Sequence, residues 1–364
     1  MKKHGKTTVI TGIILLATSH LMSSCVAGYS VLSEVMPGGS MVKTVWTKAD
    51  TSCLAGDFSK HPFLFDPAEW EMSVVNPADT FDFIGDEFIH NFVAVRKYLQ
   101  PTGTTEKPAS SGTANQPYIN GKEEWEVKKG FFANRYIYCH TFPGIAGDMP
   151  ISIVDYLTEE ELELWLESGH FKDYGFMNGV EMYSNMLSGY FVNFQKWIYD
   201  CAIEISYRII AENTGDSLTA TQKEKLFSII GKEREVDYED IMPPLPDPVS
   251  VAEAMSSISG NPAFMTSVRQ KTEELENILS AKESELMEPF HIVYRYKVGL
   301  PGRLVSANTS MSEDGYPVWK VDGYRLLAGD MVLYAESVKT NAWSFIILGA
   351  LAAAAAIALY IRRR

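Results

Sequence analysis

The sequence predicts an α+β protein with an antiparallel sheet built from the N- and C-terminal parts of its body, a helical insertion between them, and one C-terminal transmembrane helix. Polar and apolar residues alternate as in strands near both ends of the body, at residues 28–46 and 290–298. Between these segments, apolar residues recur at spacings of three and four, which is typical of helices. The chain closes on a long apolar run followed by three arginines.

The composition fits a folded body and argues against one class of partner. Of 364 residues, 46% are hydrophobic and 12% aromatic, enough for one large domain or two small ones. The formal net charge is −14. Because binding to phosphates needs an excess of Lys and Arg, we expect no nucleic-acid partner.

Residues 1–24 have the layout of a signal peptide. Lys2, Lys3 and Lys6 precede an apolar run over residues 9–17, and the first acidic residue is Glu34. The run is too short to span a bilayer as a stable helix.

Cys25 follows the residues LMSS, and this stretch resembles the lipobox of bacterial lipoproteins. In that family the signal is removed before the cysteine, whose thiol then carries a diacylglycerol. The resemblance implies lipidation of Cys25. The alternative is an ordinary signal peptide with an incidental cysteine.

The C-terminal segment predicts a transmembrane helix over residues 341–361 and a cytoplasmic tail over residues 362–364. The 19 uncharged residues from 343 to 361 would cover ~28 Å as a helix, close to the thickness of the bilayer hydrocarbon. Aromatic rings prefer the interfaces, and positive flanks stay cytoplasmic. The expected interface anchors are Trp343, Tyr360, Arg362, Arg363 and Arg364. A buried core helix and a sorting tail cut off after export are the alternatives.

These two ends predict a location in the bacterial inner membrane. A single helical span suits that membrane, so residues 25–340 would form a periplasmic domain. Acyl chains at Cys25 and the helix would hold both ends of this domain on the same face of one membrane. The expected partners are therefore the lipid bilayer and other envelope proteins.

The first part of the body predicts strands. GYSVLSEVMPGGSMVKTVW is typical of a hairpin around the turn PGG. EEWEVKKGFFANRYIYCHTF alternates so that Phe132, Tyr136 and Tyr138 share one face. Residues 101–121 have almost no apolar side chain to bury, and we expect a mobile loop there.

The middle of the body, from about residue 150 to 285, predicts a helical insertion. Thr158 begins a capping box for a first helix, and an apolar stripe over residues 183–205 indicates a helix of about six turns. After a proline-rich break, Ser250 begins a short helix, and Asn261 caps another that runs to the end of the insertion.

Strands return after the insertion. Phe290, Ile292 and Tyr294 alternate with polar residues, and PVWKV and DMVLYAE supply further short strands. The order strand, helix, strand indicates one sheet built from both ends of the body.

Several segments together resemble the uncharacterised envelope lipoproteins of the Bacteroidota type that end in a transmembrane helix. They are KKGFFANRYIYCHTF, DYLTEEELELW, FMNGVE, LPGRLVSANTS and YAESVKTNAW. The resemblance covers most of the body in order. It implies architecture and location, and it brings no activity or site residues with it.

No local motif points to an enzyme, a metal or a cofactor. The scattered histidines are His61, His90, His140, His170 and His291. None forms a metal-binding pair at helical spacing, and HExxH, GxSxG, Walker and GxGxxG motifs are missing from the sequence. We therefore predict no catalytic residue, no metal ligand and no cofactor.

Three cysteines remain if Cys25 is acylated. An oxidising compartment would permit one disulfide among Cys53, Cys139 and Cys201, with its connectivity left open. Cys201 lies on the apolar helical stripe and is the expected buried free thiol.

Three functions are compatible with these patterns. The first is a non-enzymatic envelope scaffold or partner-binding module. The second is a membrane-tethered hydrolase whose acids and histidines meet only in space, which a deep polar pocket would support. The third is a carrier of a hydrophobic ligand, which a large apolar cavity would support.

Overall fold

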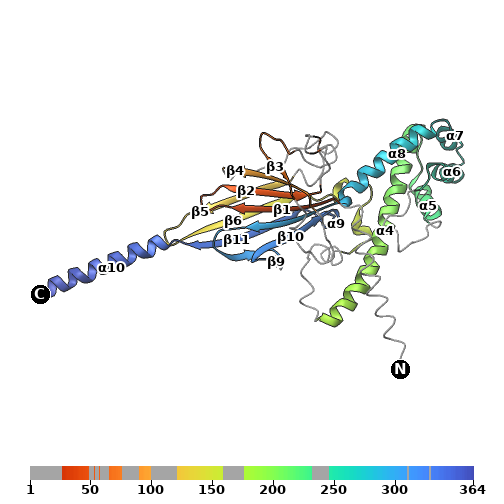
Figure 1. Cartoon of the computed structure of the whole chain (residues 1–364). Coiled ribbons are helices and arrows are strands. Elements are labelled where there is room, and N and C mark those ends of the chain that lie inside the picture. The colour runs from red at the N-terminus through yellow and green to blue at the C-terminus, as the bar shows by residue number, and fades with distance from the viewer. Residues whose placement is uncertain are drawn as a thin grey trace, which may run out of the picture.

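The structure, a computed structural model, describes residues 27–48, 53, 57, 65–75, 90–99, 121–158, 176–231, 246–309, 311–327 and 329–364. Two β-sheets lie in the middle of an elongated molecule (Figure 1). A group of helices lies at one end, and the apolar helix α10 (Ala342–Arg363) extends from the other. The predicted α+β class, with helices in the middle of the chain and one apolar C-terminal helix, is confirmed.

The larger sheet has seven strands in the order β3-β4-β2-β1-β7-β10-β9. They are β1 (Ala27–Val35), β2 (Met41–Thr47), β3 (Glu71–Val74), β4 (Phe92–Tyr98), β7 (Ile292–Gly299), β9 (Ser312–Glu313) and β10 (Tyr316–Asp322). β1 and β7 pair in parallel, with Ala27 opposite Ile292. Because parallel pairing needs a long crossover, everything between these strands, including the helices, forms the connection.

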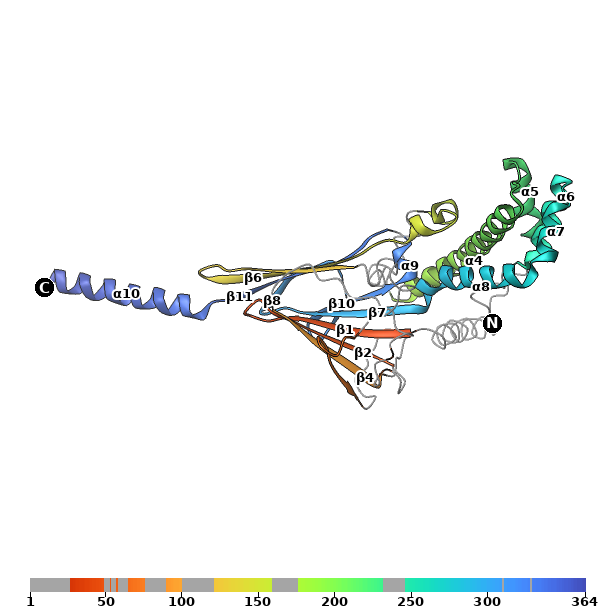
Figure 2. The same cartoon turned by 90° about the horizontal axis from the view of Figure 1, so that it is seen from above.

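The smaller sheet is antiparallel and has four strands in the order β5-β6-β11-β8. They are β5 (Lys122–Lys128), β6 (Ala133–Phe142), β8 (Arg303–Ala307) and β11 (Met331–Thr340). Strands from both ends of the body thus pair as expected. They divide between two sheets, and the β1–β7 pair is parallel. The two sheets lie face to face (Figure 2), and buried apolar side chains from both form one core cluster.

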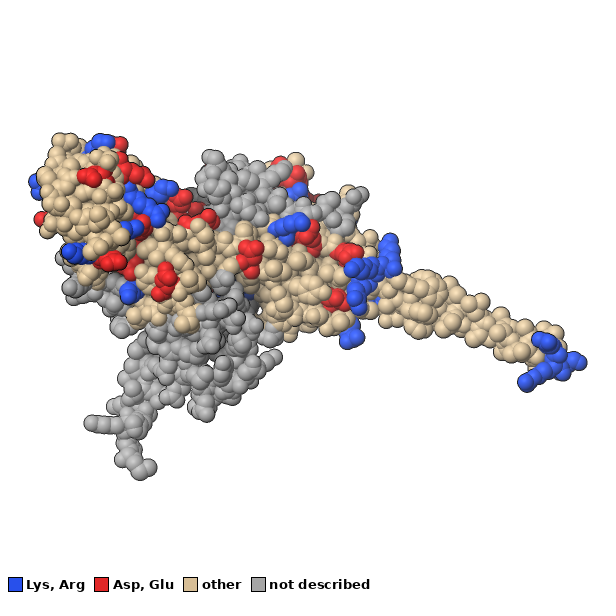
Figure 3. Space-filling model, turned by 180° about the vertical axis from the view of Figure 1, so that it is seen from behind, with Lys and Arg blue, Asp and Glu red and all other residues tan. Residues whose placement is uncertain are grey.

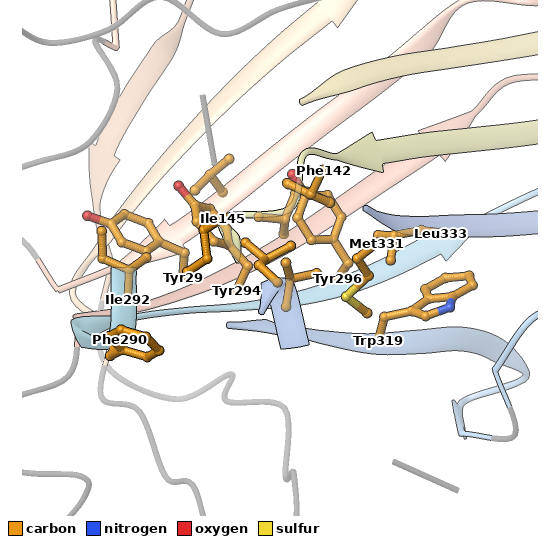
Figure 4. Close-up of a cluster of buried hydrophobic side chains, with 14 of the residues drawn as sticks. Tyr29, Phe142, Ile145, Phe290, Ile292, Tyr294, Tyr296, Trp319, Met331 and Leu333 are labelled. Atoms are coloured by element: carbon orange, nitrogen blue, oxygen red, sulfur yellow. The ribbon is translucent and has the colours of Figure 1, made fainter. Parts of the chain in front are cut away.

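Aromatic side chains fill the space between the sheets. Tyr29 of β1 stacks on Tyr294 of β7 with ring centroids 5.0 Å apart, and Phe142 of β6 meets Tyr296 of β7 at 5.4 Å. Figure 4 shows these rings together in one cluster. All four are buried, and each contributes about 1.5–3 kcal/mol on burial.

Asn308, just after β8, connects the two sheets by hydrogen bonds. Its Oδ1 accepts from the Trp319 indole of β10 at 3.0 Å and from the Tyr334 amide of β11 at 2.8 Å. Its Nδ2 donates to the Val332 carbonyl at 2.6 Å. One side chain therefore fixes β10 of the larger sheet against β11 of the smaller.

Five helices of the described part of the chain form the group at the end away from α10. They are α4 (Phe176–Thr214), α5 (Ala220–Ile230), α6 (Pro248–Ser259), α7 (Ala263–Gln270) and α8 (Thr272–Met287). Shorter helical turns are η2 (Ala146–Asp148), η3 (Ile153–Asp155), η5 (Glu288–His291) and α9 (Gly323–Leu326). This group has an apolar core of its own, separate from the core between the sheets. α4 joins the two, because Trp197 packs in the sheet core and Ile203 in the helical core.

Two helical boundaries differ from the sequence expectation. α6 is capped by Asp247, whose carboxylate accepts from the Val249 and Ser250 amides, so Ser250 lies inside the helix. The helix expected from Asn261 onward is two helices, because Lys271 leaves the helical conformation between α7 and α8. The long helix over residues 183–205 is confirmed as part of α4.

The predicted hairpin is also confirmed, with Val35 opposite Met41. Gly39 in its turn has φ +96°, a conformation that favours glycine. The pattern over β6 is confirmed only in part: Tyr136 and Tyr138 point into the core, whereas Phe132 lies in the preceding turn, half exposed. Residues 101–120, nearly all of the expected loop, and the helix expected after Thr158 lie outside the described residues.

Candidate membrane-anchoring site

α10 is the one helix among the described residues that is long and apolar enough to cross a membrane. Its 22 residues cover about 33 Å, slightly more than a typical hydrocarbon core. Apart from Ser344, its side chains are exposed rather than packed on the body. A buried core helix, the alternative weighed from the sequence, would not leave these apolar side chains uncovered.

Asn341 fastens the start of α10 to the turn between β5 and β6, residues 129–132. Its amide N donates to the Phe132 carbonyl at 2.8 Å. Its side-chain Nδ2 donates to the Gly130 carbonyl at 2.7 Å and, at 3.2 Å each, to the Phe131 carbonyl and Asn134 Oδ1. The side chain therefore bonds to the turn rather than capping its own helix, and it fixes the direction in which α10 leaves the body.

Four aromatic side chains surround this junction, and we call them the basal aromatic cluster: Phe131, Phe132, Trp343 and Phe345. Phe131 meets Trp343 with ring centroids 5.0 Å apart, and Phe132 meets Phe345 at 5.9 Å. Each of the four is about half exposed, between 49% and 52%. Large aromatic side chains prefer the boundary between hydrocarbon and water, so this cluster marks a plane at which α10 can enter a bilayer.

The interface anchors expected from the sequence lie at the two ends of α10. Trp343 belongs to the basal aromatic cluster, while Tyr360 and the three arginines lie about 25 Å away at the other end. The Arg364 guanidinium lies over the Tyr360 ring at 4.9 Å. Cys25, the expected lipidation site, lies outside the described residues.

The start of β1 lies at the opposite end of the sheets from α10. The Trp125 indole donates to the Gly39 carbonyl at 2.8 Å, which places the β1–β2 turn beside the strands that lead to α10. Ala27, eight residues before the end of β1, is therefore about 26 Å from that end and lies beside the helices. Cys25 is two residues from Ala27, a reach of at most ~7 Å. Anchoring of both ends in one membrane, as the sequence predicts, would require the sheets to lie flat on that membrane, and it stays a prediction.

A second group of functional interest lies between the two sheets. We call it the buried polar network: Ser33, Lys43, Glu123, Tyr138 and His140. Lys43 Nζ of β2 is 2.9 Å from Glu123 Oε2 of β5, and both side chains are almost fully buried. Glu123 Oε1 accepts from the Ser33 hydroxyl at 2.7 Å and from the Tyr138 hydroxyl at 2.5 Å.

Burial and charge shift the pKa values of this network strongly. Burial alone would raise the pKa of Glu123, but the charges of Lys43 and His140 and the hydrogen bonds from Lys43 and Tyr138 outweigh it and lower the pKa to about 2. Burial is the main cause that lowers the pKa of His140 to about 3, against the opposing effect of Glu123. Burial and then Glu123 raise the pKa of Tyr138. At neutral pH the network holds one ion pair, a neutral imidazole and a neutral phenol.

The buried polar network unites a histidine with a carboxylate, as a hydrolase would need, but it lies inside the core rather than in an open pocket. His140 packs on the rings of Phe142 and Tyr296, and its Nε2 lies 2.7 Å from where a Cβ on Gly121 would be. Substrate has no room beside it. The arrangement is that of a polar connection between two sheets.

The remaining histidines do not join it. His90 is buried on the other face of the larger sheet, with its Nε2 2.8 Å from the Ser30 hydroxyl, and His291 is exposed after α8. His61 and His170 lie outside the described residues. Within the described part of the chain, no three His, Cys, Asp or Glu side chains gather as a metal site would require.

All three expected cysteines are free thiols, so the disulfide that the sequence permits is not formed in this structure. Cys201 is buried, as predicted, and burial together with Asp200 and Glu204 raises the pKa of its thiol to about 12. A thiol in this state is a poor nucleophile.

One small depression lies in the helical group, between α4, α6 and α8. Its volume is about 220 Å³, and it is lined by polar and apolar side chains that include Ser206, Asp247 and Leu279. Sites for drug-sized ligands usually hold ~300–1,000 Å³ and are mainly apolar. This depression is therefore no match for the cavity that a carrier of hydrophobic ligands would need.

Sequence reasoning missed the residues that join α10 to the body. Asn341 and Gly130 are 211 residues apart, so no local pattern links them. A signal was nevertheless present in KKGFF: two adjacent phenylalanines in a turn, after two lysines, have no strand position in which to be buried.

Comparisons of this chain with protein-family models, with characterised proteins and with solved structures find no match.

Proposed function

We propose that this chain is a membrane-anchored domain of a bacterial cell envelope, acting as a non-enzymatic scaffold or partner-binding module. In this proposal α10 spans the inner membrane, the body lies in the periplasm, and residues 362–364 lie in the cytoplasm. Removal of the signal peptide and lipidation of Cys25 belong to the same proposal.

The observation that carries the proposal is the junction at Asn341. α10 continues from β11 and is bonded to the β5–β6 turn, so the sheets stand on the helix as one body. The five helices then lie at the end far from α10 (Figure 2). A body held in this way presents its helical end to partners away from the bilayer, which is what a scaffold needs.

The orientation rests on charge along the chain. Three arginines lie at the C-terminal end of α10, whereas Lys339 is the one basic residue in the ten residues before the helix. Since flanking Lys and Arg resist translocation, the C-terminus is expected inside. The hydrolase and carrier alternatives have no specific observation in their favour among the described residues.

Alkaline carbonate extraction tests the anchor. Four chains are compared: the full chain, Cys25→Ser, a chain ending at Asn341, and the chain with both changes. The Cys25→Ser chain should stay in the membrane pellet because α10 holds it, and the doubly changed chain should be released. Release of Cys25→Ser by carbonate would show that α10 is not a span. The chain ending at Asn341 reports on the acyl group alone.

Topology and partners need separate measurements. A reporter fused after Arg364 should be active only in the cytoplasm, and activity confined to the periplasm would reverse the orientation. Crosslinking in intact cells, followed by purification of the full chain, should recover a defined envelope protein. Recovery of none would remove the support for a scaffold while leaving the anchor in place.

A further inference from the structure

The body carries a group of cations around the base of α10, although the chain as a whole has a net charge of −14. We call them the basal cations: Lys128, Lys129, Arg135, Arg303 and Lys339. Figure 3 shows Lys and Arg side chains gathered where α10 leaves the body. All five side chains are exposed.

Strand register explains why residues so far apart in the sequence meet there. Lys128 of β5 is opposite Arg135 of β6, Arg135 is opposite Val338 of β11, and Val338 is opposite Arg303 of β8. Directly opposite residues project from the same face of a sheet. Three cations from three strands therefore form one row across the smaller sheet.

This row lies at the height of lipid headgroups when α10 spans a bilayer. Val338 is three residues before Asn341, so the row is about 10 Å from the start of α10. The basal aromatic cluster fixes the hydrocarbon boundary at Trp343 and Phe345. Headgroups extend ~5–8 Å beyond that boundary, and charges act on them over a Debye length of ~8–10 Å.

The basal cations are only partly neutralised by the protein. Lys128 pairs with Glu126 at 3.2 Å and Arg135 with Glu336 at 3.1 Å. Lys129, Arg303 and Lys339 form no ion pair with a described residue. Three positive charges therefore remain for an outside ligand at the membrane surface.

We propose that the basal cations bind the headgroups of anionic phospholipids in the leaflet that α10 enters on the side of the body. Lys129, Arg303 and Lys339 contact the phosphates, while Phe131 and Phe132 lie at the acyl boundary. This inference rests on the proposed function, because it requires α10 to span the bilayer. It adds a lipid preference that the helix alone does not explain.

Quenching of Trp343 fluorescence by brominated lipids tests the inference. The full chain is reconstituted into vesicles of phosphatidylglycerol and phosphatidylcholine, with one or the other lipid brominated. The Trp343→Phe chain supplies the background from other tryptophans. Since each cation near an anionic surface is worth about fivefold in binding, the wild type should prefer phosphatidylglycerol by about fivefold or more around Trp343.

A triple variant, K129Q/R303Q/K339Q, should bring that preference close to one. The matched control K225Q/R269Q/K282Q removes three exposed cations from the helical group, and it should keep the preference. The preference should also fall as NaCl rises from 50 to 500 mM.

Three outcomes overturn the inference: equal quenching by both lipids in the wild type, an equal loss of preference in the control variant, or a preference that the triple variant keeps. Equal quenching by both lipids is also the result expected if an acidic protein segment, rather than lipid, covers the basal cations. Failure of the proposed function looks different, because without insertion neither brominated lipid quenches Trp343.

Discussion

At the scale of single residues, the buried polar network is the costliest feature of the core. Removing Lys43 and Glu123 from water is unfavourable, and their attraction compensates only because Ser33 and Tyr138 satisfy the remaining carboxylate oxygen. The pair connects β2 of one sheet to β5 of the other. It fixes one relative position of the two sheets, which apolar side chains alone would specify less sharply.

The network predicts a loss of stability in mild acid. The pKa of His140 is lowered from 6.5 to about 3 in the folded protein, so the unfolded chain takes up a proton first as the pH falls. Stability should therefore decrease as the pH drops from 6.5 toward 3, by about 2 kcal/mol at pH 5 from this residue. Glu123 adds a further loss between about pH 4.5 and 2, in the same direction.

Urea unfolding of the full chain in detergent, at pH 7 and pH 5, measures this effect. His140→Leu should lose about 2 kcal/mol less than the wild type between the two pH values. His90, whose pKa burial and Arg295 lower to about 4, adds to the loss in both chains and does not change the comparison. Equal pH dependence in the two chains would contradict a buried neutral His140.

At the scale of elements, the β5–β6 turn and α10 behave as one unit. The turn is short because Gly130 permits a close approach: a Cβ there would lie 2.5 Å from the Ala133 carbonyl oxygen. This brings three turn groups within reach of Asn341. These hydrogen bonds hold α10 in line with the strands, whereas a flexible linker would leave its direction undefined.

Asn341→Ala should loosen this unit. The change removes three hydrogen bonds from Nδ2 and keeps the one from the amide N, for an expected cost of about 1–3 kcal/mol. Hydrogen exchange at the start of β6 and at Asn341 itself should accelerate in the reconstituted chain, while exchange in α4 stays as in the wild type. Asn341→Asp, whose side chain is isosteric but cannot donate a hydrogen bond, should accelerate this exchange at least as much. Unchanged exchange in both variants would mean that α10 is held by its aromatic contacts instead.

At the scale of the whole molecule, the order is apolar helix α10, then the sheets, then the group of helices. α10 lies in line with the strands in both views (Figures 1 and 2). If α10 crosses a bilayer as proposed, the sheets stand upright on that bilayer and the start of β1 faces away from it. In an upright molecule, an acyl chain on Cys25 has to enter a lipid surface other than the one that α10 spans.

The upright arrangement predicts the height of the body above a bilayer. The ten-residue strands β6 and β11 alone contribute about 33 Å, and the helices add to this. Atomic force microscopy of the full chain in a supported bilayer should therefore find a height well above ~33 Å. Two sheets lying flat would give roughly 20 Å, the ~10 Å between sheets plus their outer side chains. A height near that lower value would allow both ends to share one membrane.

Local patterns were sufficient for the elements themselves. The apolar length of α10, the turn glycine of the first hairpin and the stripe of α4 each depend on neighbours within a few residues. Local patterns also explain the two wrong helix boundaries. Asp247 and Ser250 are both possible caps, three residues apart, and the structure uses Asp247. Lys271 ends α7 although the apolar pattern of the sequence continues past it.

The sequence by itself determined the α+β class, the apolar C-terminal helix and its terminal arginines, because hydropathy and charge along a short segment are sufficient to fix them. Only the tertiary structure decided that the strands form two sheets, that Lys43 pairs with Glu123, and that Phe131 meets Trp343. The two residue contacts join segments 80 and more than 200 residues apart, so no local pattern links them. Which strands pair depends on burying the apolar faces of both sheets at once.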